Sequence, residues 1–311
     1  MKVSCFQNMD KMKTALTKAD VVNHWQVLHI DPQKLKADAG NLHQAVQLVA
    51  MAGKYFITET ADDSHTASSW IAGKSLQLGG QIHGGKQDFM VGLSYPDFAL
   101  QLLRTDLEII TAFPLNGKTF AEAFQWLWNQ LKMQELNATK LLPKMHFDIP
   151  DHPIKHGNPF RIESFEYLQE LARHRTNGHL LHQYFQQLLH RDEDVLIWPH
   201  HFDEGLYLPL TFDGEAPTSS ISFGLSMPDI YYPEPYFYVT AWEKEEKTTM
   251  KDLKLSSLGH WHRQDWLGQV LETHFIVQAG TTVSEQAGLG LSFLQQAINN
   301  ALKMVGKNQE I

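Results

Sequence analysis

Apolar residues in the N-terminal part of the chain recur at helical spacing. Leu42 and Val46 lie about one turn apart and share a face, which indicates a buried stripe. Asp31-Pro32 is a helix start signal, because Asp accepts a hydrogen bond at the N-cap and the first turn tolerates proline. Gly53 is a stop signal. We therefore predict that residues 1–56 are mainly helical.

Residues 57–140 change to short apolar runs followed by one amphipathic stretch. Runs separated by Gly, Pro and Asp are typical of a small antiparallel sheet. Thr119 and Glu122 have the spacing of a capping box, so we expect a helix to begin at Phe120. The predicted strands are Leu76–Leu78, Phe89–Leu93, Phe98–Leu103 and Leu107–Phe113.

Residues 160–311 contain a second set of helices and strands. Two helices are predicted at about 163–175 and 179–191, because Asn177-Gly178 between them is a turn signal. A last helix is expected over 284–305. The strands predicted between these helices are Leu196–Leu210, Ser219–Ser226 and Tyr236–Trp242.

Together these elements predict an α+β fold in a single domain, residues 1–311, with two sheet-containing halves. A hexapeptide links the halves, since Gly92–Asp97 and Gly224–Asp229 differ at one position of six. Internal duplication would explain this. Coincidence is the alternative, because strand–turn sequences draw on few residue types.

Charge excludes two classes of partner. The chain has 26 Lys and Arg against 35 Asp and Glu, a formal net charge of −9 with His neutral. Nucleic acids and anionic membranes are bound by concentrated positive fields. We therefore expect neither nucleic acid nor membrane as a partner, and a small polar molecule instead.

The sequence also predicts a cytoplasmic location. Met1–Lys13 has no apolar core of signal-peptide length, and no stretch approaches the ~20 apolar residues of a spanning helix. Cys5 is the single cysteine and can form no internal disulfide, which suits a reducing compartment.

The chain contains 17 histidines, and Trp198–Glu204 places two of them beside acidic residues. On a strand, His201 and Asp203 would share a face. Such a pair can hold a divalent metal or act as an acid–base pair. The alternative is a strand end whose polar face is solvated.

A second candidate is the His260-Trp261-His262 sequence. On a strand both imidazoles would lie on one side, a spacing common in zinc and iron sites. Two surface histidines at this spacing also arise without a function.

The segment after Ser226 supplies two further carboxylates, Asp229 and Glu234. Prolines on both sides of Glu234 hold it in place, either as a positioned carboxylate or as a rigid exposed rim. A turn near Asp213-Gly214 would return Ser226 beside His201 and Asp203, so these motifs are expected to converge at one sheet edge.

His65 follows Asp62-Asp63-Ser64 in a predicted loop. It is a further catalytic candidate, and an Asx turn at Asp63 is the structural alternative.

The set of motifs resembles a group of bacterial proteins of unknown function, with a more distant likeness to the domain of unknown function 5996 family. The resemblance covers about residues 42–302, and it implies a shared architecture without implying a reaction. The motifs that carry it are Asp62–Thr66, Asp151–Pro153, Trp198–Asp203, Gly224–Ser226, Glu234–Val239 and Gly259–His262. One departure is Ser226-Met227-Pro228-Asp229, where Ser-Pro-Gly-Asp is expected.

Three functional hypotheses follow. The first is an enzyme with a divalent metal (Zn, Mn or Fe) or a His/carboxylate pair acting on a small polar substrate. Its predicted metal ligands are His201, Asp203, His260 and His262, and its catalytic candidates are His201, Asp203, Glu234, Asp229 and His65. The second is a binding module whose pocket is lined by Trp198, Tyr236, Trp261 and Trp266. The third is a structural polar network.

Overall fold

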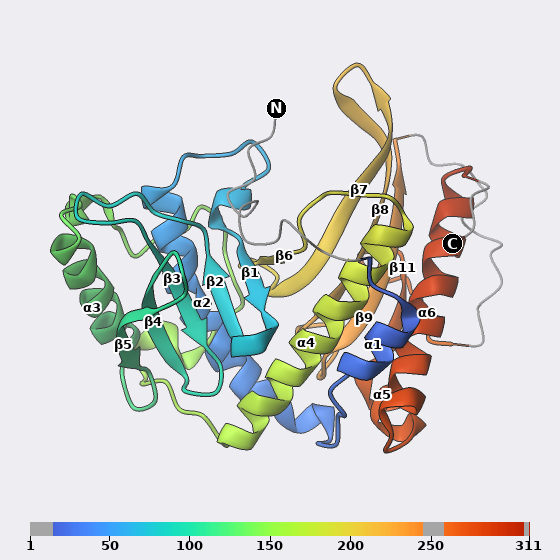
Figure 1. Cartoon of the computed structure of the whole chain (residues 1–311), viewed down its shortest axis with the longest axis horizontal. Coiled ribbons are helices and arrows are strands. Elements are labelled where there is room, and N and C mark those ends of the chain that lie inside the picture. Colours follow the sequence, from blue (N-terminus) through green and yellow to red (C-terminus); the bar gives the residue numbers. More distant parts are fainter. Residues whose placement is uncertain (1–14, 245–257, 308–310) are drawn as a thin grey trace. The chain divides into compact units, whose positions relative to one another are not determined.

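The computed structural model (Figure 1) describes residues 15–244, 258–307 and 311. The chain forms two compact units. The first unit comprises Lys34–Ala172 and Leu196–Asp203. The second comprises the described parts of Arg173–Val195 and Glu204–Ile311, with the segment that ends at Gln33. Both units combine helices with antiparallel strands, so the predicted α+β class is confirmed. Cys5 and the start of the predicted N-terminal helical segment lie outside the described residues.

The sheet of the first unit has the strand order β6-β1-β2-β3-β4-β5, all antiparallel. The pairing of Phe89 with Arg104 sets the β3–β4 register. The four strands predicted in this region are confirmed within a few residues. Its strands are β1 (Ser68–Ile71), β2 (Leu76–Gly79), β3 (Phe89–Ser94), β4 (Ala99–Arg104), β5 (Ile109–Pro114) and β6 (Leu196–Trp198).

Helix α2 (Lys36–Phe56) packs against β2 and β3, with Leu42 and Val46 buried as predicted. The predicted stop at Gly53 is wrong, because the helix continues to Phe56. A Cβ at Gly53 would lie 2.2 Å from the carbonyl oxygen of His65. Gly53 therefore permits a close backbone approach instead of ending the helix.

Helix α3 (Phe120–Met133) begins where the sequence predicts. Thr119 Oγ1 accepts a hydrogen bond from the Glu122 backbone N–H, and the Glu122 carboxylate accepts one from the Thr119 backbone N–H. Short 3₁₀ helices cover Pro32–Leu35, Ser64–Thr66, Ala72–Lys74, Ala138–Lys140 and Pro153–His156. In the described part of the chain, no helix is both long enough and apolar enough to cross a bilayer.

One helix, α4 (Phe165–Leu188), replaces the two helices predicted around Asn177-Gly178. The Asn177 side chain accepts a hydrogen bond from the Gln26 backbone N–H and donates one to the Gln26 carbonyl. A Cβ at Gly178 would lie 2.7 Å from the Leu225 side chain. The Asn-Gly pair therefore serves packing against neighbouring elements and does not form a turn.

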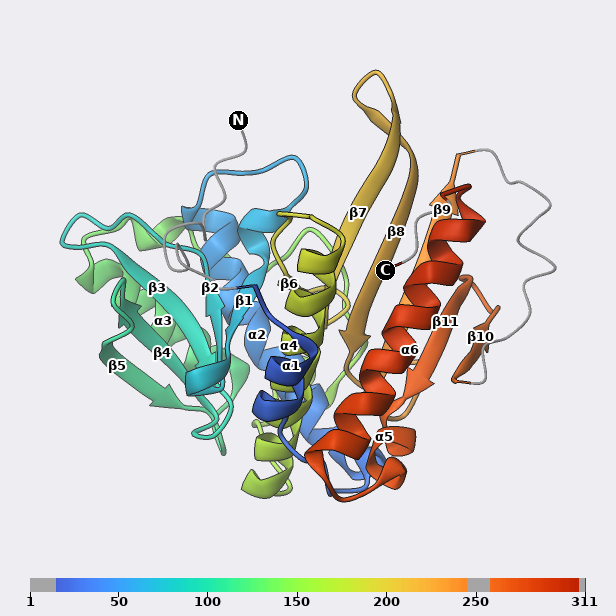
Figure 2. The same cartoon turned by 45° about the vertical axis from the view of Figure 1, so that its right-hand side comes forward.

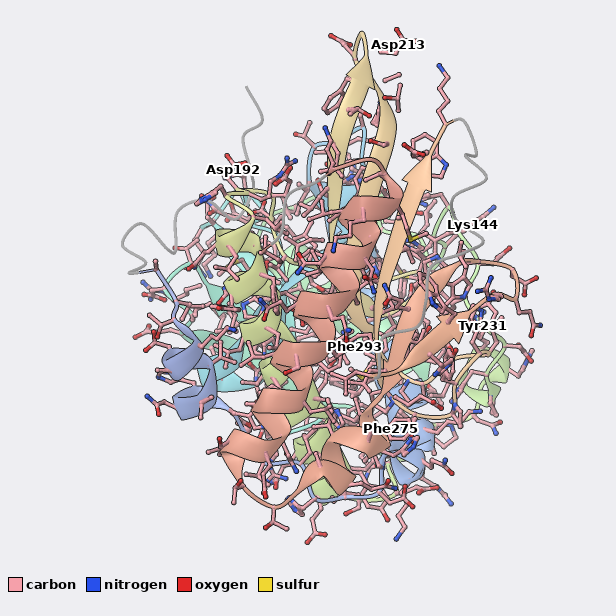
Figure 3. The ribbon with its side chains drawn as sticks, turned by 90° about the vertical axis from the view of Figure 1, so that its right-hand side faces the viewer. Lys144, Asp192, Asp213, Tyr231, Phe275 and Phe293 are labelled. Carbon is pink, nitrogen blue, oxygen red and sulfur yellow. The ribbon has the colours of Figure 1, made fainter. Side chains whose placement is uncertain are left out.

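The sheet of the second unit has the order β7-β8-β9-β11-β10, again antiparallel. Its first hairpin turns at Gly214, whose φ of 62° suits glycine, and Asp213 lies at the hairpin tip as predicted (Figure 3). The strands are β7 (Asp203–Asp213), β8 (Ala216–Ser226), β9 (Tyr236–Glu243), β10 (His260–His262) and β11 (Gly268–Glu272).

The predicted continuous strand Leu196–Leu210 is interrupted. Residues 199–202 form a turn between β6 and β7, with Phe202 at a left-handed φ of 59°. His201 therefore does not lie on a strand, and the argument that strand alternation places it on one face with Asp203 is wrong.

Helix α6 (Val283–Met304) covers β8 and β9 within the second unit (Figure 2). It buries Phe293 and Ile298, which confirms the predicted C-terminal helix. Two shorter helices, α1 (Lys18–His24) and α5 (Thr273–Ala279), pack against α6.

Candidate functional site

Three predicted site residues belong to the first unit and have different surroundings. His65 is buried, and its Nδ1 lies 3.3 Å from the Thr60 backbone nitrogen, from which it accepts a hydrogen bond. His201 is exposed in the turn before β7, and Asp203 is half-buried at the start of that strand. The contacts of His65 are those of a structural histidine.

The other four predicted residues, Asp229, Glu234, His260 and His262, belong to the second unit. Both histidines lie on β10, whose register pairs His260 with Val270 of β11. Because alternate residues of a strand share a face, the two imidazoles point the same way, as predicted.

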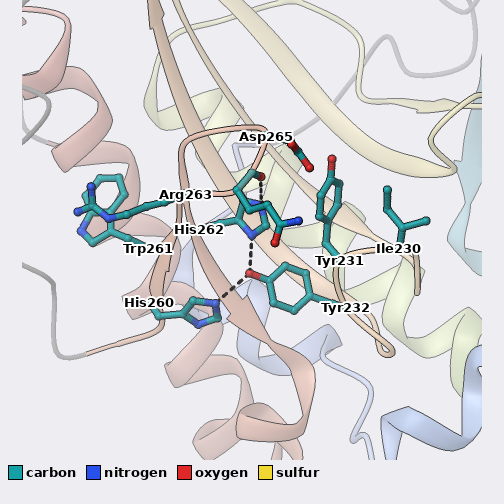
Figure 4. Close-up of a pocket in the computed structure, with 9 residues that line it drawn as sticks. Ile230, Tyr231, Tyr232, His260, Trp261, His262, Arg263 and Asp265 are labelled. Carbon is teal, nitrogen blue, oxygen red and sulfur yellow. Dashed lines mark hydrogen bonds between the residues drawn. The ribbon is translucent and has the colours of Figure 1, made fainter.

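Tyr232 joins these two histidines (Figure 4). Its hydroxyl oxygen lies 2.9 Å from His260 Nε2 and 2.9 Å from His262 Nδ1. The other nitrogen of His262, Nε2, lies 2.5 Å from the carbonyl oxygen of Gln264.

These contacts fix the direction of each proton. A carbonyl can only accept, so neutral His262 carries its proton on Nε2 and accepts at Nδ1. Tyr232 has one hydroxyl proton, which it donates to His262. The Tyr232 oxygen then accepts from His260 Nε2–H, and Nδ1 is the ring nitrogen of His260 left for other partners.

Asp229 positions Tyr232. Asp229 Oδ1 accepts hydrogen bonds from the backbone N–H groups of Tyr231 (2.8 Å) and Tyr232 (2.9 Å). Asp229 Oδ2 accepts one from the Tyr236 hydroxyl at 2.6 Å. With both oxygens engaged, this carboxylate organises the loop and acts through Tyr232.

Burial, together with the weaker effect of the nearby Glu272 and Asp229 carboxylates, raises the pKa of Tyr232 to about 12. The phenol therefore keeps its proton throughout the neutral range. It serves as a hydrogen-bonding link between the imidazoles and not as a nucleophile.

A cavity of about 410 Å³ is lined in part by Tyr232, His260 and His262. The Trp266 ring stacks on His262 with ring centroids 4.1 Å apart, which restrains the imidazole. A cavity of this volume suits a small molecule. It is lined by Ile230, Tyr231, Tyr232, His260, Trp261, His262, Arg263, Gln264 and Asp265.

A second group of titratable side chains lies beside the first. His274 Nδ1 is 2.6 Å from Glu234 Oε1, and one ligand atom each from Glu234, Glu272 and His274 lie within 4.8 Å of one another. His260 Nδ1 lies 3.9 Å from Glu272 Oε2, so Glu272 faces both groups.

The metal set predicted from the sequence differs from this group. Across the described ranges, the group close enough to hold one ion is Glu234, Glu272 and His274, and it contains none of the four predicted ligands. His260 Nε2 and His262 Nδ1 both contact the Tyr232 hydroxyl.

Sequence reasoning missed Tyr232, Glu272 and His274. Tyr232 lies in the segment that follows Ser226, from which the sequence predicts Asp229 and Glu234 as catalytic candidates and Tyr236 as a pocket residue. Glu272-Thr273-His274 repeats the alternate spacing of His260-Trp261-His262, and this was the available signal.

No family model, no curated protein and no solved structure matches the chain. The resemblance to the domain of unknown function 5996 family therefore stays a prediction.

Replacing Tyr232 with phenylalanine is expected to lower the free energy of unfolding by about 1–2 kcal/mol, because His260 and His262 lose their shared partner. Urea denaturation followed by circular dichroism measures this. Tyr207→Phe is the matched control, since that side chain is exposed, and it should cost less than about 0.5 kcal/mol. Equal stability of the Tyr232→Phe variant and the wild type would show that the link adds nothing to the fold.

Proposed function

We propose that the second unit carries the active site of an enzyme that acts on a small polar molecule, with His260 as the acid–base group. The proposal includes the cytoplasmic location expected from the sequence. The observation that carries it is the Tyr232 hydroxyl, which lies 2.9 Å from both His260 and His262 on the wall of a cavity.

The choice of His260 follows from its contacts. Tyr232 engages Nε2, so the tautomer that donates there leaves the Nδ1 lone pair to take a proton. About 41% of the His260 side chain is exposed, which gives a substrate access. The Glu272 carboxylate, 3.9 Å from Nδ1, stabilises the imidazolium that forms.

The sequence predicts either a divalent metal or a His/carboxylate pair in the active site. The contacts of Tyr232 favour the His/carboxylate pair over a metal held by His260 and His262. A metal on these two residues would need the nitrogens that meet at the Tyr232 hydroxyl. Breaking both hydrogen bonds would leave the buried phenol without these partners, at a cost of about 1–3 kcal/mol.

Hydrolysis of p-nitrophenyl acetate and p-nitrophenyl phosphate, measured as release of p-nitrophenolate, tests the proposal. His260→Gln is expected to lower kcat/KM at least tenfold on the ester that the wild type hydrolyses, because it removes the base. His83→Gln, at an exposed histidine of the first unit, is the matched control and should keep the wild-type rate.

Absence of wild-type turnover of both esters, or equal turnover in the His260→Gln variant, contradicts the acid–base proposal. The aromatic cavity would then support the alternative of a non-catalytic binding module. In that case Trp261→Ala, and not His260→Gln, should weaken ligand binding.

A further inference from the structure

We propose that Glu234, Glu272 and His274 form a binding site for one divalent transition-metal ion such as Mn²⁺ or Zn²⁺. Neither His260 nor Tyr232 is one of its three ligands, but Glu272 also faces His260 Nδ1, so the two sites adjoin at this residue.

The fold brings the three residues together by backbone pairing. Tyr236, at the start of β9, pairs with Glu272, at the end of β11. The Thr273 backbone N–H and hydroxyl both donate to the Pro235 carbonyl, at 3.0 and 2.9 Å. Glu234 precedes one side of this junction and His274 follows the other, so the chain holds both at the same sheet edge.

The main evidence for the site is the environment of the Glu234 carboxylate. Its side chain is fully buried, and His274 engages Oε1 through both Nδ1 and the backbone N–H. Oε2 is also buried, and within the described part of the chain no hydrogen bond reaches it. A buried carboxylate oxygen without a partner is costly, and a bound cation is one of the few groups that would offset that cost.

The spacing of the group suits an ion. One ligand atom from each residue lies within 4.8 Å of the others. Bonds of about 2.0–2.2 Å to carboxylate oxygen and imidazole nitrogen are compatible with such separations after small side-chain adjustments.

The donor set selects the class of metal. Two carboxylates neutralise a divalent charge, while the imidazole favours transition metals over Mg²⁺ or Ca²⁺. No thiolate takes part, so a soft ion such as Cu⁺ is disfavoured. The set matches Mn²⁺, Fe²⁺ and Zn²⁺.

An ion could reach this group from solvent. The Glu272 and His274 side chains are about 22% and 28% exposed. Glu272 also lines a second cavity of about 400 Å³, with Leu271 and Phe275 on its walls. Three protein ligands and an adjoining cavity leave coordination positions open to water or a substrate.

Titration with Mn²⁺ alone, followed by loss of the free-ion signal in electron paramagnetic resonance, tests the site on the full chain without an affinity tag. We expect one Mn²⁺ per chain, displaced by one equivalent of Zn²⁺. Glu234→Gln should weaken binding at least tenfold. Glu215→Gln, at the exposed β7–β8 turn, is the matched control and should bind as the wild type does.

Absence of Mn²⁺ binding by the wild type, or equal binding by the Glu234→Gln variant, overturns the proposal. If Glu234→Gln fails to fold, Glu272→Gln at a partly exposed ligand must show the same loss. The His260→Gln variant should retain Mn²⁺, so failure of the acid–base proposal and failure of the metal site give different results.

Discussion

Lowering the pH from about 5 to about 2 is expected to decrease the free energy of unfolding of the wild type by about 3 kcal/mol more than that of a Glu204→Gln variant. The reason lies in a buried cluster at the start of β7. Glu204 is fully buried, with His179 Nδ1 at 2.6 Å and His182 Nδ1 at 3.8 Å from its Oε1.

Burial alone would raise the pKa of Glu204, but the two imidazoles outweigh it and lower that pKa from 4.5 to about 2. As the pH falls, Glu204 is therefore protonated near pH 4.5 in the unfolded chain, while in the folded chain it stays ionised until about pH 2. Between these two values acid favours unfolding, so the stabilisation is complete above about pH 5 and is lost as pH falls toward 2.

Denaturant titrations from neutral pH down to the acid limit, on both proteins, measure this difference. The carboxylates of the capping boxes, Asp20, Glu122 and Glu285, also have lowered pKa values, but they are present in both proteins and cancel. Glu215→Gln, at an exposed turn, should keep the wild-type acid sensitivity. Parallel pH dependences for the wild type and Glu204→Gln would show that this cluster does not carry the effect.

The sequence predicts those features of the fold that depend on a few neighbouring residues. The capping box at Thr119 and Glu122, the stripe of α2 and the turn at Gly214 each follow from local chemistry, and each is present. Gly53 and Gly178 fail as break signals for a common reason. Each is small because a distant backbone or side chain lies against it, and that contact is invisible in the local sequence.

The candidate site shows the same division. His260 and His262 share a face because strand alternation is local. The group of Glu234, Glu272 and His274 depends on β11 lying between β9 and β10, an order that differs from the order along the chain. The turn at 199–202 removes the strand on which the pairing of His201 with Asp203 was predicted.

Glu272 is the residue through which the two proposals meet. Its Oε2 lies 3.9 Å from His260 Nδ1, and one of its carboxylate oxygens lies within 4.8 Å of a ligand atom of Glu234 and of His274. If both proposals hold, the ion held by Glu234, Glu272 and His274 would supply Lewis-acid chemistry beside the His260 imidazole, which would unite the two branches of the sequence hypothesis. If only the acid–base proposal holds, Glu272 acts on His260. If only the metal proposal holds, it acts with Glu234 and His274.

Replacing Gly224 with alanine is expected to lower the free energy of unfolding by about 3 kcal/mol, whereas the equivalent change at Gly92 should cost about 1 kcal/mol or less. The two glycines occupy the same position in the repeated hexapeptide. A Cβ at Gly224 would lie 2.5 Å from the Glu204 carbonyl oxygen and 2.6 Å from the Tyr238 hydroxyl. The backbone of the paired strand cannot move aside cheaply, because its hydrogen bonds hold it in register.

A Cβ at Gly92 would lie closest to two terminal methyl groups, those of Leu76 (2.9 Å) and Leu103 (3.2 Å), and its nearest backbone atom, the Gln77 carbonyl oxygen, is 3.3 Å away instead of 2.5 Å. These side chains can change rotamer, and alanine restores about 0.5–1 kcal/mol that glycine loses in a strand. Urea denaturation of both variants measures the difference in unfolding free energy. Equal losses would mean that the shared hexapeptide imposes the same packing in both units, and that the cross-strand contacts of Gly224 do not set the cost.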